Sequence, residues 1–431
     1  MTYEETLKKI DSYQRFSTKP GLERISKLLS LLGNPQDRLQ FVHVAGTNGK
    51  GTACTLIASV LLKAGYRVGL YLSPHVCDFR ERMQSCGEMI PRNELAAASE
   101  RVFAAAEQLR ASGMNVNEFE LITAIAMLWF AERGCEIVVL EVGLGGRFDA
   151  TNIIKNPLIS VIMSISLDHT KILGDTIEQI ALEKCGIIKK HCPVVCSPDE
   201  LPEALEVIRR ISKENESQLT EADANQLKIV KSDFSGTELE YCGEKLHLPF
   251  LGGHQVKNAA TVLAVFEVLR ASGWNIPSSA LKEGFSSARL PARLEVLSLN
   301  PPILLDGAHN PEGTAALAKA IRHYLSGKKI IAVMGMMADK DAAQAVKNLA
   351  GLFQKVIAVA PSSPRAMSAA DFADLWQKSG TPALAAGNSA EALNLAFPAL
   401  GPDGALVICG SLYLAGDLRA LLIERIKNMK K

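Results

Sequence analysis

The chain has 431 residues, which is too long for one ordinary domain, so two or three domains are expected. Its 47 Lys and Arg residues nearly balance 46 Asp and Glu residues, and a net charge of +1 gives no electrostatic footprint for nucleic acid or an anionic membrane. No apolar run reaches membrane-spanning length, and the charged N-terminus is unlike a secretory signal. The nine cysteines form no C-x-x-C pair, which favours reduced thiols in a cytoplasmic protein over zinc sites or disulfides.

Residues 1–37 are predicted to be a helical lead-in with an apolar stripe that faces the core. A buried strand, Leu39–Ala45, follows and breaks at a glycine-rich turn. The turn leads into a helix whose apolar residues recur at helical spacing up to Ala64, with Gly65 suited to a left-handed cap. This strand, turn and helix N-terminus form a site for phosphate, because backbone N–H groups and the helix dipole are joined there by the charge of Lys50.

The turn sequence GTNGKGT, from Gly46 to Thr52, departs from the Walker pattern. Val44 holds the position of the early glycine, and Gly51 separates Lys50 from Thr52. The alternative is a glycine-rich turn with no ligand.

Four more apolar strands are predicted near residues 66–72, 136–142, 158–165 and 193–197, with helices near 94–112 and 120–133 between them. This alternation predicts a parallel α/β sheet with its functional groups at the carboxyl ends of the strands. Ser73 and His169 follow two of these strands, and Glu141 lies near the end of a third, 136–142. Mg²⁺ prefers oxygen ligands, so Ser73 and Glu141 fit it better than a histidine does. The alternative for Glu141 is an ion pair with Arg147.

In the segment 173–190, Thr176 is expected to cap a helix that runs through Lys184. From the residues alone, Lys184 reads as a solvated charge. Residues 225–250 read as a small β excursion, and a helix is expected at 255–272. Its first turn carries Asn258, for which helix capping is the alternative to a ligand contact.

The proline-punctuated stretch 288–302 is predicted to be an interdomain linker between residues 1–287 and 303–431. After it the α/β alternation restarts, with strands near 303–306, 330–334, 356–359, 383–386 and 405–409. The motif DGAHNP places Asp306 at a strand end and His309 in the following turn, where Pro311 starts a helix.

Taken together, HVAGTNGKGT, KPGLER (Lys19 to Arg24) and DGAHNP resemble the folylpolyglutamate synthase and dihydrofolate synthase family of the Mur ligase superfamily. The resemblance implies a Mur-ligase-like P-loop ATPase domain with a parallel-rich sheet, followed by a smaller Rossmann-like α/β domain. It also implies ATP-dependent ligation of L-glutamate to a folate or pteroate carboxylate through an acyl phosphate.

By resemblance, ATP and two Mg²⁺ ions are the implied cofactors, and Lys184 becomes carbamylated to help hold the second ion. In this chain Ala292 replaces the glycine of the family's P-G-R motif, which implies a different turn if that glycine needs positive φ. The implied site residues are Gly46, Thr47, Asn48, Gly49, Lys50, Gly51, Thr52, Asn258, Arg293 and Asp306 for ATP, Ser73, Glu141, His169 and Lys184 for metal, Lys50, Lys184 and His309 for catalysis, and His309 and Ser411 for glutamate.

The expected partners are L-glutamate, dihydropteroate and tetrahydrofolate polyglutamates, and a monomer is expected. The sequence leaves open whether glutamate is joined to dihydropteroate, to tetrahydrofolate polyglutamates or to both. It also leaves the folate pocket open, and residues 76–90 are the segment in which to look for that pocket. The alternatives are another Mur-type amino acid ligase and a P-loop nucleotide-binding regulator without ligase activity.

Overall fold

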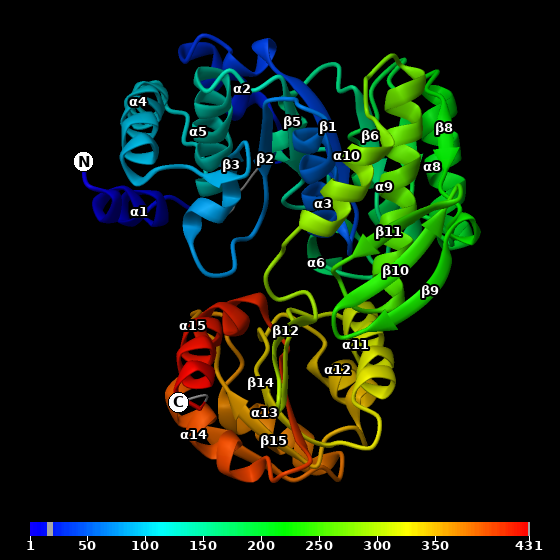
Figure 1. The fold of residues 1–431 in the computed structure, drawn as a ribbon. Helices are drawn as coiled ribbons and strands as arrows, with labels where there is room; N and C mark the ends of the chain where they lie inside the picture. The colour runs from blue at the N-terminus through cyan, green and yellow to red at the C-terminus, as the bar shows by residue number, and fades with distance from the viewer. Residues whose placement is uncertain (15–19, 430–431) are drawn as a thin grey trace. The chain divides into compact units, whose positions relative to one another are not determined.

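The computed structural model describes residues 1–14 and 20–429, and Figure 1 traces their fold. Lys19 of the KPGLER motif lies outside the described residues. The chain divides into two compact units. The first comprises Met1–Leu227 and Lys257–Ala288, and the second comprises Lys228–Val256 and Arg289–Lys431.

The first unit is built on an eight-stranded sheet with the order β4-β3-β2-β5-β1-β6-β7-β8. Strand β1 lies in its middle and pairs in parallel with β5 and β6, so the chain enters the phosphate turn at the centre of the sheet. Strands β3 and β4 form an antiparallel hairpin at one edge. The strands are β1 (Gln40–Ala45), β2 (Val68–Tyr71), β3 (Met83–Ser85), β4 (Glu88–Met89), β5 (Ile137–Glu141), β6 (Ile159–Ile162), β7 (Val194–Cys196) and β8 (Leu219–Glu221).

Helices of the first unit bury apolar faces in two clusters on this sheet. One cluster joins α1, α2, α4 and α5 to β1 and β5, and the other joins α7 and α8 to β6 and β7. The helices are α1 (Tyr3–Asp11), α2 (Glu23–Leu31), α3 (Lys50–Lys63), α4 (Arg92–Ala111), α5 (Glu118–Glu132), α6 (Thr170–Leu173), α7 (Ile177–Cys185), α8 (Pro202–Glu214), α9 (Gly253–Ala271), whose first residues belong to the second unit, and α10 (Ser278–Ser287).

The second unit contains a six-stranded sheet with the order β12-β13-β17-β14-β15-β16, in which only β12 is antiparallel to its neighbour. A separate antiparallel sheet has the order β11-β10-β9. The strands are β9 (Lys228–Asp233), β10 (Gly236–Tyr241), β11 (Glu244–Leu248), β12 (Glu295–Leu299), β13 (Pro302–Leu305), β14 (Lys329–Met334), β15 (Lys355–Val359), β16 (Ala383–Ala386) and β17 (Gly404–Cys409), and the helices are α11 (Pro311–Tyr324), α12 (Ala342–Leu349), α13 (Ala369–Lys378), α14 (Ser389–Ala396) and α15 (Leu412–Met429).

The predicted mixed α/β class and all ten major strands of the two α/β parts are confirmed. The expectation that 288–302 is an irregular linker is wrong in one respect, because β12 lies inside it and pairs with β13. The small β excursion is also confirmed, but residues 228–256 group with the second unit, whereas the sequence prediction placed them in the first domain. Tyr324 of α11 accounts for part of this grouping, since its hydroxyl is 2.8 Å from the Ser232 hydroxyl and accepts a hydrogen bond from the Gly252 N–H.

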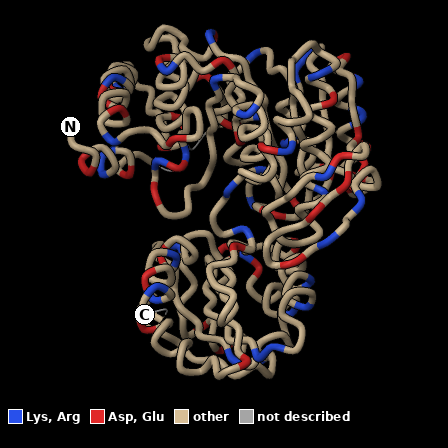
Figure 2. Tube along the Cα trace, in the orientation of Figure 1, with Lys and Arg blue, Asp and Glu red and all other residues tan. Residues whose placement is uncertain are grey.

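Basic and acidic residues are interspersed along the trace, in keeping with the balanced charge (Figure 2). Within the described part of the chain, no helix is both long enough and apolar enough to cross a membrane.

Candidate active site

The glycine-rich turn after β1 is forced into its shape by two close approaches. Gly46 has φ 148°, and a Cβ added there would lie 2.6 Å from the Cβ of Met163. Gly49 has φ 84°, and a Cβ there would collide with the amide oxygen of Asn258. Glycine is therefore required at both positions. Asn258 from α9 packs against the turn at Gly49.

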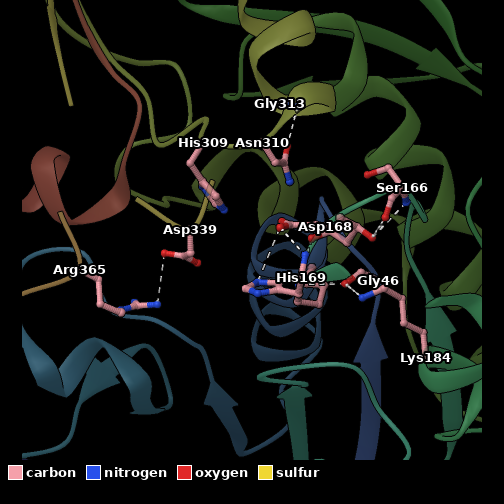
Figure 3. A network of polar contacts seen from close by, with 12 residues as sticks. Gly46, Ser166, Asp168, His169, Lys184, His309, Asn310, Gly313, Asp339 and Arg365 are labelled. Carbon is pink, nitrogen blue, oxygen red and sulfur yellow. Dashed lines mark hydrogen bonds and ion pairs between the residues drawn. The ribbon is translucent and has the colours of Figure 1, made fainter. Parts of the chain in front are cut away.

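Two lysines point their ammonium groups at one carbonyl oxygen of this turn. Lys50 Nζ donates to the carbonyls of Gly46 and Thr47 at 3.0 and 3.1 Å, and Lys184 Nζ donates to Gly46 at 2.8 Å. Figure 3 shows Lys184 reaching Gly46. Burial, with a smaller contribution from the charge of Lys50, lowers the pKa of Lys184 to about 7. The solvated reading of Lys184 is wrong, because the residue is only 4% exposed.

Lys184 reaches the turn because its helix is held at both ends. Thr176 and Gln179 form a capping box at the start of α7, as the sequence predicted for Thr176. Near its end, the Arg147 N–H donates to the Glu183 carbonyl, and the Asn152 amide donates to the Arg147 and Gly186 carbonyls. The GLGGR segment therefore serves close packing against α7.

Ser73 and Glu141 come together at the carboxyl ends of β2 and β5. The Ser73 N–H donates to Glu141 Oε2 at 2.8 Å, and Glu141 is 4% exposed. The Ser73 hydroxyl is buried and has no hydrogen-bond partner. Arg147 makes an ion pair with Glu183, with 4.0 Å between Nη1 and Oε1. A buried hydroxyl in need of a partner beside a carboxylate is an oxygen donor set that fits Mg²⁺.

His169 lies at the N-terminus of α6, with φ 52° and a side chain that is 39% exposed. Its Nε2 is 4.0 Å from the Asp168 carboxylate, and Figure 3 shows both residues near Gly46. The same loop is tied to the phosphate turn, because the Ser166 N–H donates to the Thr47 hydroxyl. Among the described residues, no three His, Cys, Asp or Glu side chains form a metal site by themselves, so a metal here would depend on Ser73 and backbone, phosphate or water ligands as well.

In the second unit, Arg293 lies in a turn between Ala292, with φ 56°, and Leu294, with φ 48°. The positive φ expected of the family glycine is therefore kept with an alanine. Asp306, at the end of β13, is 8% exposed and accepts hydrogen bonds from backbone N–H groups of this turn and of the next one.

The DGAHNP turn and the start of α15 carry the other predicted residues of this unit. Nδ1 of His309 donates to the Gly307 carbonyl at 2.8 Å, because a carbonyl oxygen can only accept. Asn310 caps α11 by accepting from the Gly313 N–H (Figure 3). The Ser411 hydroxyl is buried and accepts from the Tyr413 N–H, so Ser411 caps the first turn of α15.

Two protein-family models match this chain. Residues 44–266 match the Mur ligase middle domain, and residues 292–412 match the Mur ligase glutamate ligase domain. Folylpolyglutamate synthase from Lacticaseibacillus casei is 37% identical over 98% of this chain and 99% of that protein. The chain belongs to the folylpolyglutamate synthase and dihydrofolate synthase family of Mur ligases. The dihydrofolate synthase/folylpolyglutamate synthase of Bacillus subtilis is 35% identical over 97% of this chain and 99% of that protein.

Solved structures of the folylpolyglutamate synthase family agree with this assignment. The Mycobacterium tuberculosis enzyme complexed with ADP and AMPPCP superposes with a TM-score of 0.89 at 30% identity, covering 97% of this chain and 98% of the other. The Escherichia coli FolC protein in complex with DHPP and ADP gives a TM-score of 0.86 at 29% identity, covering 100% and 99%.

One buried hydrogen-bond network was not predicted from the sequence. His43, in the centre of β1, is fully buried and its Nε2 is 2.9 Å from the Thr151 hydroxyl, which donates to Asp149 at 2.6 Å. Asp149 also accepts from the Leu144 N–H, so the chain links β1 to the loop after Glu141. A histidine inside an otherwise apolar strand was the available signal, since a buried polar group needs a partner.

Proposed function

We propose that this protein uses ATP to join L-glutamate to the carboxylate of a folate or pteroate, through an acyl phosphate intermediate. Membership of the folylpolyglutamate synthase family supports the reaction class. The observation that carries the proposal in this structure is the pair of amines, from Lys50 and Lys184, that converges on the Gly46 carbonyl at the head of α3. Of the two, Lys50 supplies the positive charge beside the N-terminus of α3 that suits the phosphates of ATP.

The carboxylate of the acceptor attacks the γ-phosphate, and the amine of glutamate then displaces phosphate from the acyl carbon. Negative charge develops on the transferred phosphoryl group, so Lys50 acts by electrostatic stabilisation. In our proposal the turn Gly46–Thr52 cradles the phosphates and Asn258 lies at the adenine. Arg293 and Asp306 are proposed as further contacts of ATP.

Ser73, Glu141 and His169 are proposed to hold Mg²⁺, which when bound would neutralise charge on the transferred phosphoryl group. The buried Ser73 hydroxyl without a partner supports this assignment. Lys184 is proposed to be carbamylated, which would add a carboxylate for a second Mg²⁺. In that reaction the neutral amine adds to carbon dioxide, an N–C bond forms and one proton leaves. A pKa of about 7 provides the neutral amine at physiological pH.

Residues 303–431 are proposed to supply the glutamate side of the reaction, with His309 as a catalytic group and Ser411 as a glutamate contact. The proposed acceptors are dihydropteroate and tetrahydrofolate polyglutamates, which makes the enzyme bifunctional. We propose that it acts as a monomer, and size-exclusion chromatography with light scattering tests this.

The test of function is glutamate-dependent ADP release in the presence of Mg²⁺, with dihydropteroate, tetrahydrofolate or no acceptor. Release with both acceptors supports a bifunctional synthase, and release with tetrahydrofolate alone makes it a dedicated polyglutamate enzyme. Two outcomes contradict the proposal: ADP release that does not depend on the acceptor, and no release with either folate. These outcomes favour a nucleotide-binding regulator or another Mur-type ligase.

The metal and carbamate assignments have matched controls in the same region. Glu141→Gln should raise the Mg²⁺ concentration needed for half-maximal rate at least about tenfold, because a buried carboxylate is lost, whereas Glu178→Gln, in the first turn of α7, should not. Lys184→Ala should remove the dependence of the rate on added bicarbonate together with most activity. Lys190→Ala alters an exposed lysine and should keep both.

A further inference from the structure

Arg82 is a buried arginine with no carboxylate to balance its charge. It ends the short helix Phe79–Arg82 of the first unit and is 8% exposed. Its Nε donates to Nδ1 of His75 at 3.0 Å, and its Cζ lies 5.6 Å from the centroid of the Phe79 ring. Within the part of the chain that the structure describes, its side chain makes no ion pair and no further hydrogen bond. A buried charge is costly unless a partner of opposite charge compensates it.

The groups beside Arg82 do not supply the missing negative charge. Because the arginine N–H donates to Nδ1 of His75, that nitrogen carries no proton and the imidazole is neutral. Asp78 is engaged by a two-pronged ion pair with Arg80, whose shortest N–O distance is 2.7 Å. Glu81 accepts hydrogen bonds from three backbone N–H groups of its own loop. The two carboxylates nearest in sequence are therefore committed to other partners.

The two terminal nitrogens of Arg82 are open to a ligand. Neither has a hydrogen-bond partner among the described residues, and neither is sealed off from solvent. The Leu72 N–H donates to the Arg82 carbonyl at 3.0 Å, which puts this residue at the carboxyl end of β2, beside Ser73. Burial raises the pKa of the Tyr71 hydroxyl, and the charge of Arg82 acts against that shift, so the guanidinium lies within electrostatic reach of this ring.

The strand order separates Arg82 from the phosphate turn. Strand β5 lies between β2 and β1, so the end of β2 is two strand spacings, about 10 Å, from the turn that follows β1. The paired groups of Ser73 and Glu141 lie between the two, at the ends of β2 and β5. An anion at Arg82 is therefore a different group from the phosphates proposed to lie in the turn.

Aromatic rings accompany the guanidinium at this edge of the sheet. The centroids of His75 and Phe79 are 5.6 Å apart, and those of Tyr71 and Phe119 are 6.2 Å apart. A cation among aromatic rings suits a carboxylate that is carried by an aromatic compound, and the planar fork of arginine matches a carboxylate with two parallel hydrogen bonds.

We infer that Arg82 binds a carboxylate of the acceptor, with His75 as the positioning residue that holds its guanidinium. This inference rests on the proposed function and names one contact of the acceptor site, in the segment 76–90. The carboxylate has two sources, the aromatic acid of dihydropteroate and the glutamate of tetrahydrofolate.

Calorimetric binding of each acceptor, with Mg·AMPPCP in place of ATP, tests the inference without ligation. Arg82→Gln removes the charge, so the Kd for the acceptor whose carboxylate it binds should rise at least about tenfold. The matching carboxamide keeps the ring systems but lacks the negative charge, so it should bind the wild type and Arg82→Gln with equal Kd. Equal losses for the acid and its carboxamide would mean that Arg82 only supports the pocket, which overturns the inference.

The two acceptors separate the two sources of the carboxylate. A rise in Kd for dihydropteroate supports the aromatic carboxylate, because this acceptor carries no other. A rise confined to tetrahydrofolate supports a glutamate carboxylate. Unchanged Kd values for both acceptors overturn the inference, as does a rise that appears only in the Kd for Mg·AMPPCP.

Arg80→Gln is the matched control, since it removes a charge from the same short helix but from a guanidinium already paired with Asp78. It should leave both Kd values unchanged. Should Arg82→Gln fail to fold, Arg82→Lys keeps the charge and loses the fork, and the comparison of acid with carboxamide is made on it. A wild type that binds neither acceptor refutes the proposed function and this inference together. Unchanged affinity in Arg82→Gln beside normal ligation by the wild type overturns the inference alone.

Discussion

A neutral histidine inside the central strand makes the stability of this protein dependent on pH in a way that can be measured. His43 is fully buried, and burial, reinforced by the charge of Lys189, lowers its pKa to about 3. The Thr151 hydroxyl donates its hydrogen bond to Asp149, so it accepts one from the Nε2–H of His43, which a neutral imidazole can supply. The perturbation is His43→Gln, whose amide can donate to the same hydroxyl but does not titrate.

The magnitude follows from the two pKa values. In the unfolded chain the imidazole takes up a proton near its usual value of 6.5, whereas the folded protein resists protonation until about pH 3. The neutral form therefore contributes stability that is fully present above pH 6.5 and is lost as the pH falls towards 3. Over the whole window this is about 5 kcal/mol, and between pH 7 and pH 5 it is about 2 kcal/mol.

The assay is urea unfolding at pH 7 and pH 5, followed by circular dichroism and by hydrogen exchange of the amides of β1 and β5. Between pH 7 and pH 5 the free energy of unfolding of the wild type should fall by about 2 kcal/mol more than that of His43→Gln. His191→Gln, which alters an exposed imidazole in the same unit, should behave as the wild type does. Equal losses in the wild type and in His43→Gln would refute the argument that burial keeps this imidazole neutral.

Three further predictions concern Lys50, the close approach at Gly46 and the positive φ at Ala292. Lys50→Ala should lower the rate of glutamate-dependent ADP release about a thousandfold, because one charge at the phosphates is lost. Gly46→Ala should destabilise the first unit by about 2 kcal/mol or more in urea unfolding, because the added methyl overlaps Met163. Ala292→Gly should stabilise the second unit by about 1 kcal/mol in the same assay, because the left-handed φ then carries no side-chain penalty.

Each of these has an outcome that contradicts it. Normal turnover in Lys50→Ala would contradict the assignment of the turn Gly46–Thr52 as the phosphate loop. Gly65→Ala is the control for Gly46→Ala, since Gly65 also has positive φ but open space around it. If Gly46→Ala and Gly65→Ala lower the free energy of unfolding equally, the overlap with Met163 does not contribute to the loss. A less stable Ala292→Gly variant means that the turn is not strained.

Local patterns were enough for much of the fold and for the phosphate turn. The strands before Gly46 and Asp306 are short apolar runs bounded by glycine or polar residues, and Thr176 capped α7 as predicted. These features depend on side chains within a few positions of one another, so the sequence displays them directly. The positive φ at Ala292 was not predicted, because an alanine in place of the family glycine was expected to imply a different turn.

Long-range packing determines which groups are buried together. Lys184 read locally as a solvated charge, and its amine reaches Gly46 because α7 packs on the segment 143–152. Strand β12 escaped prediction because it is an irregular edge strand with a shift of register at Val296 and Ser298, and its pairing with β13 is not local. The partners of His43 and Asp306 likewise come from other segments. Sequence thus determined most of the elements, the phosphate turn and the family. Burial and long-range hydrogen bonds depend on chain segments far apart, and they determined the protonation and placement of the groups in the site.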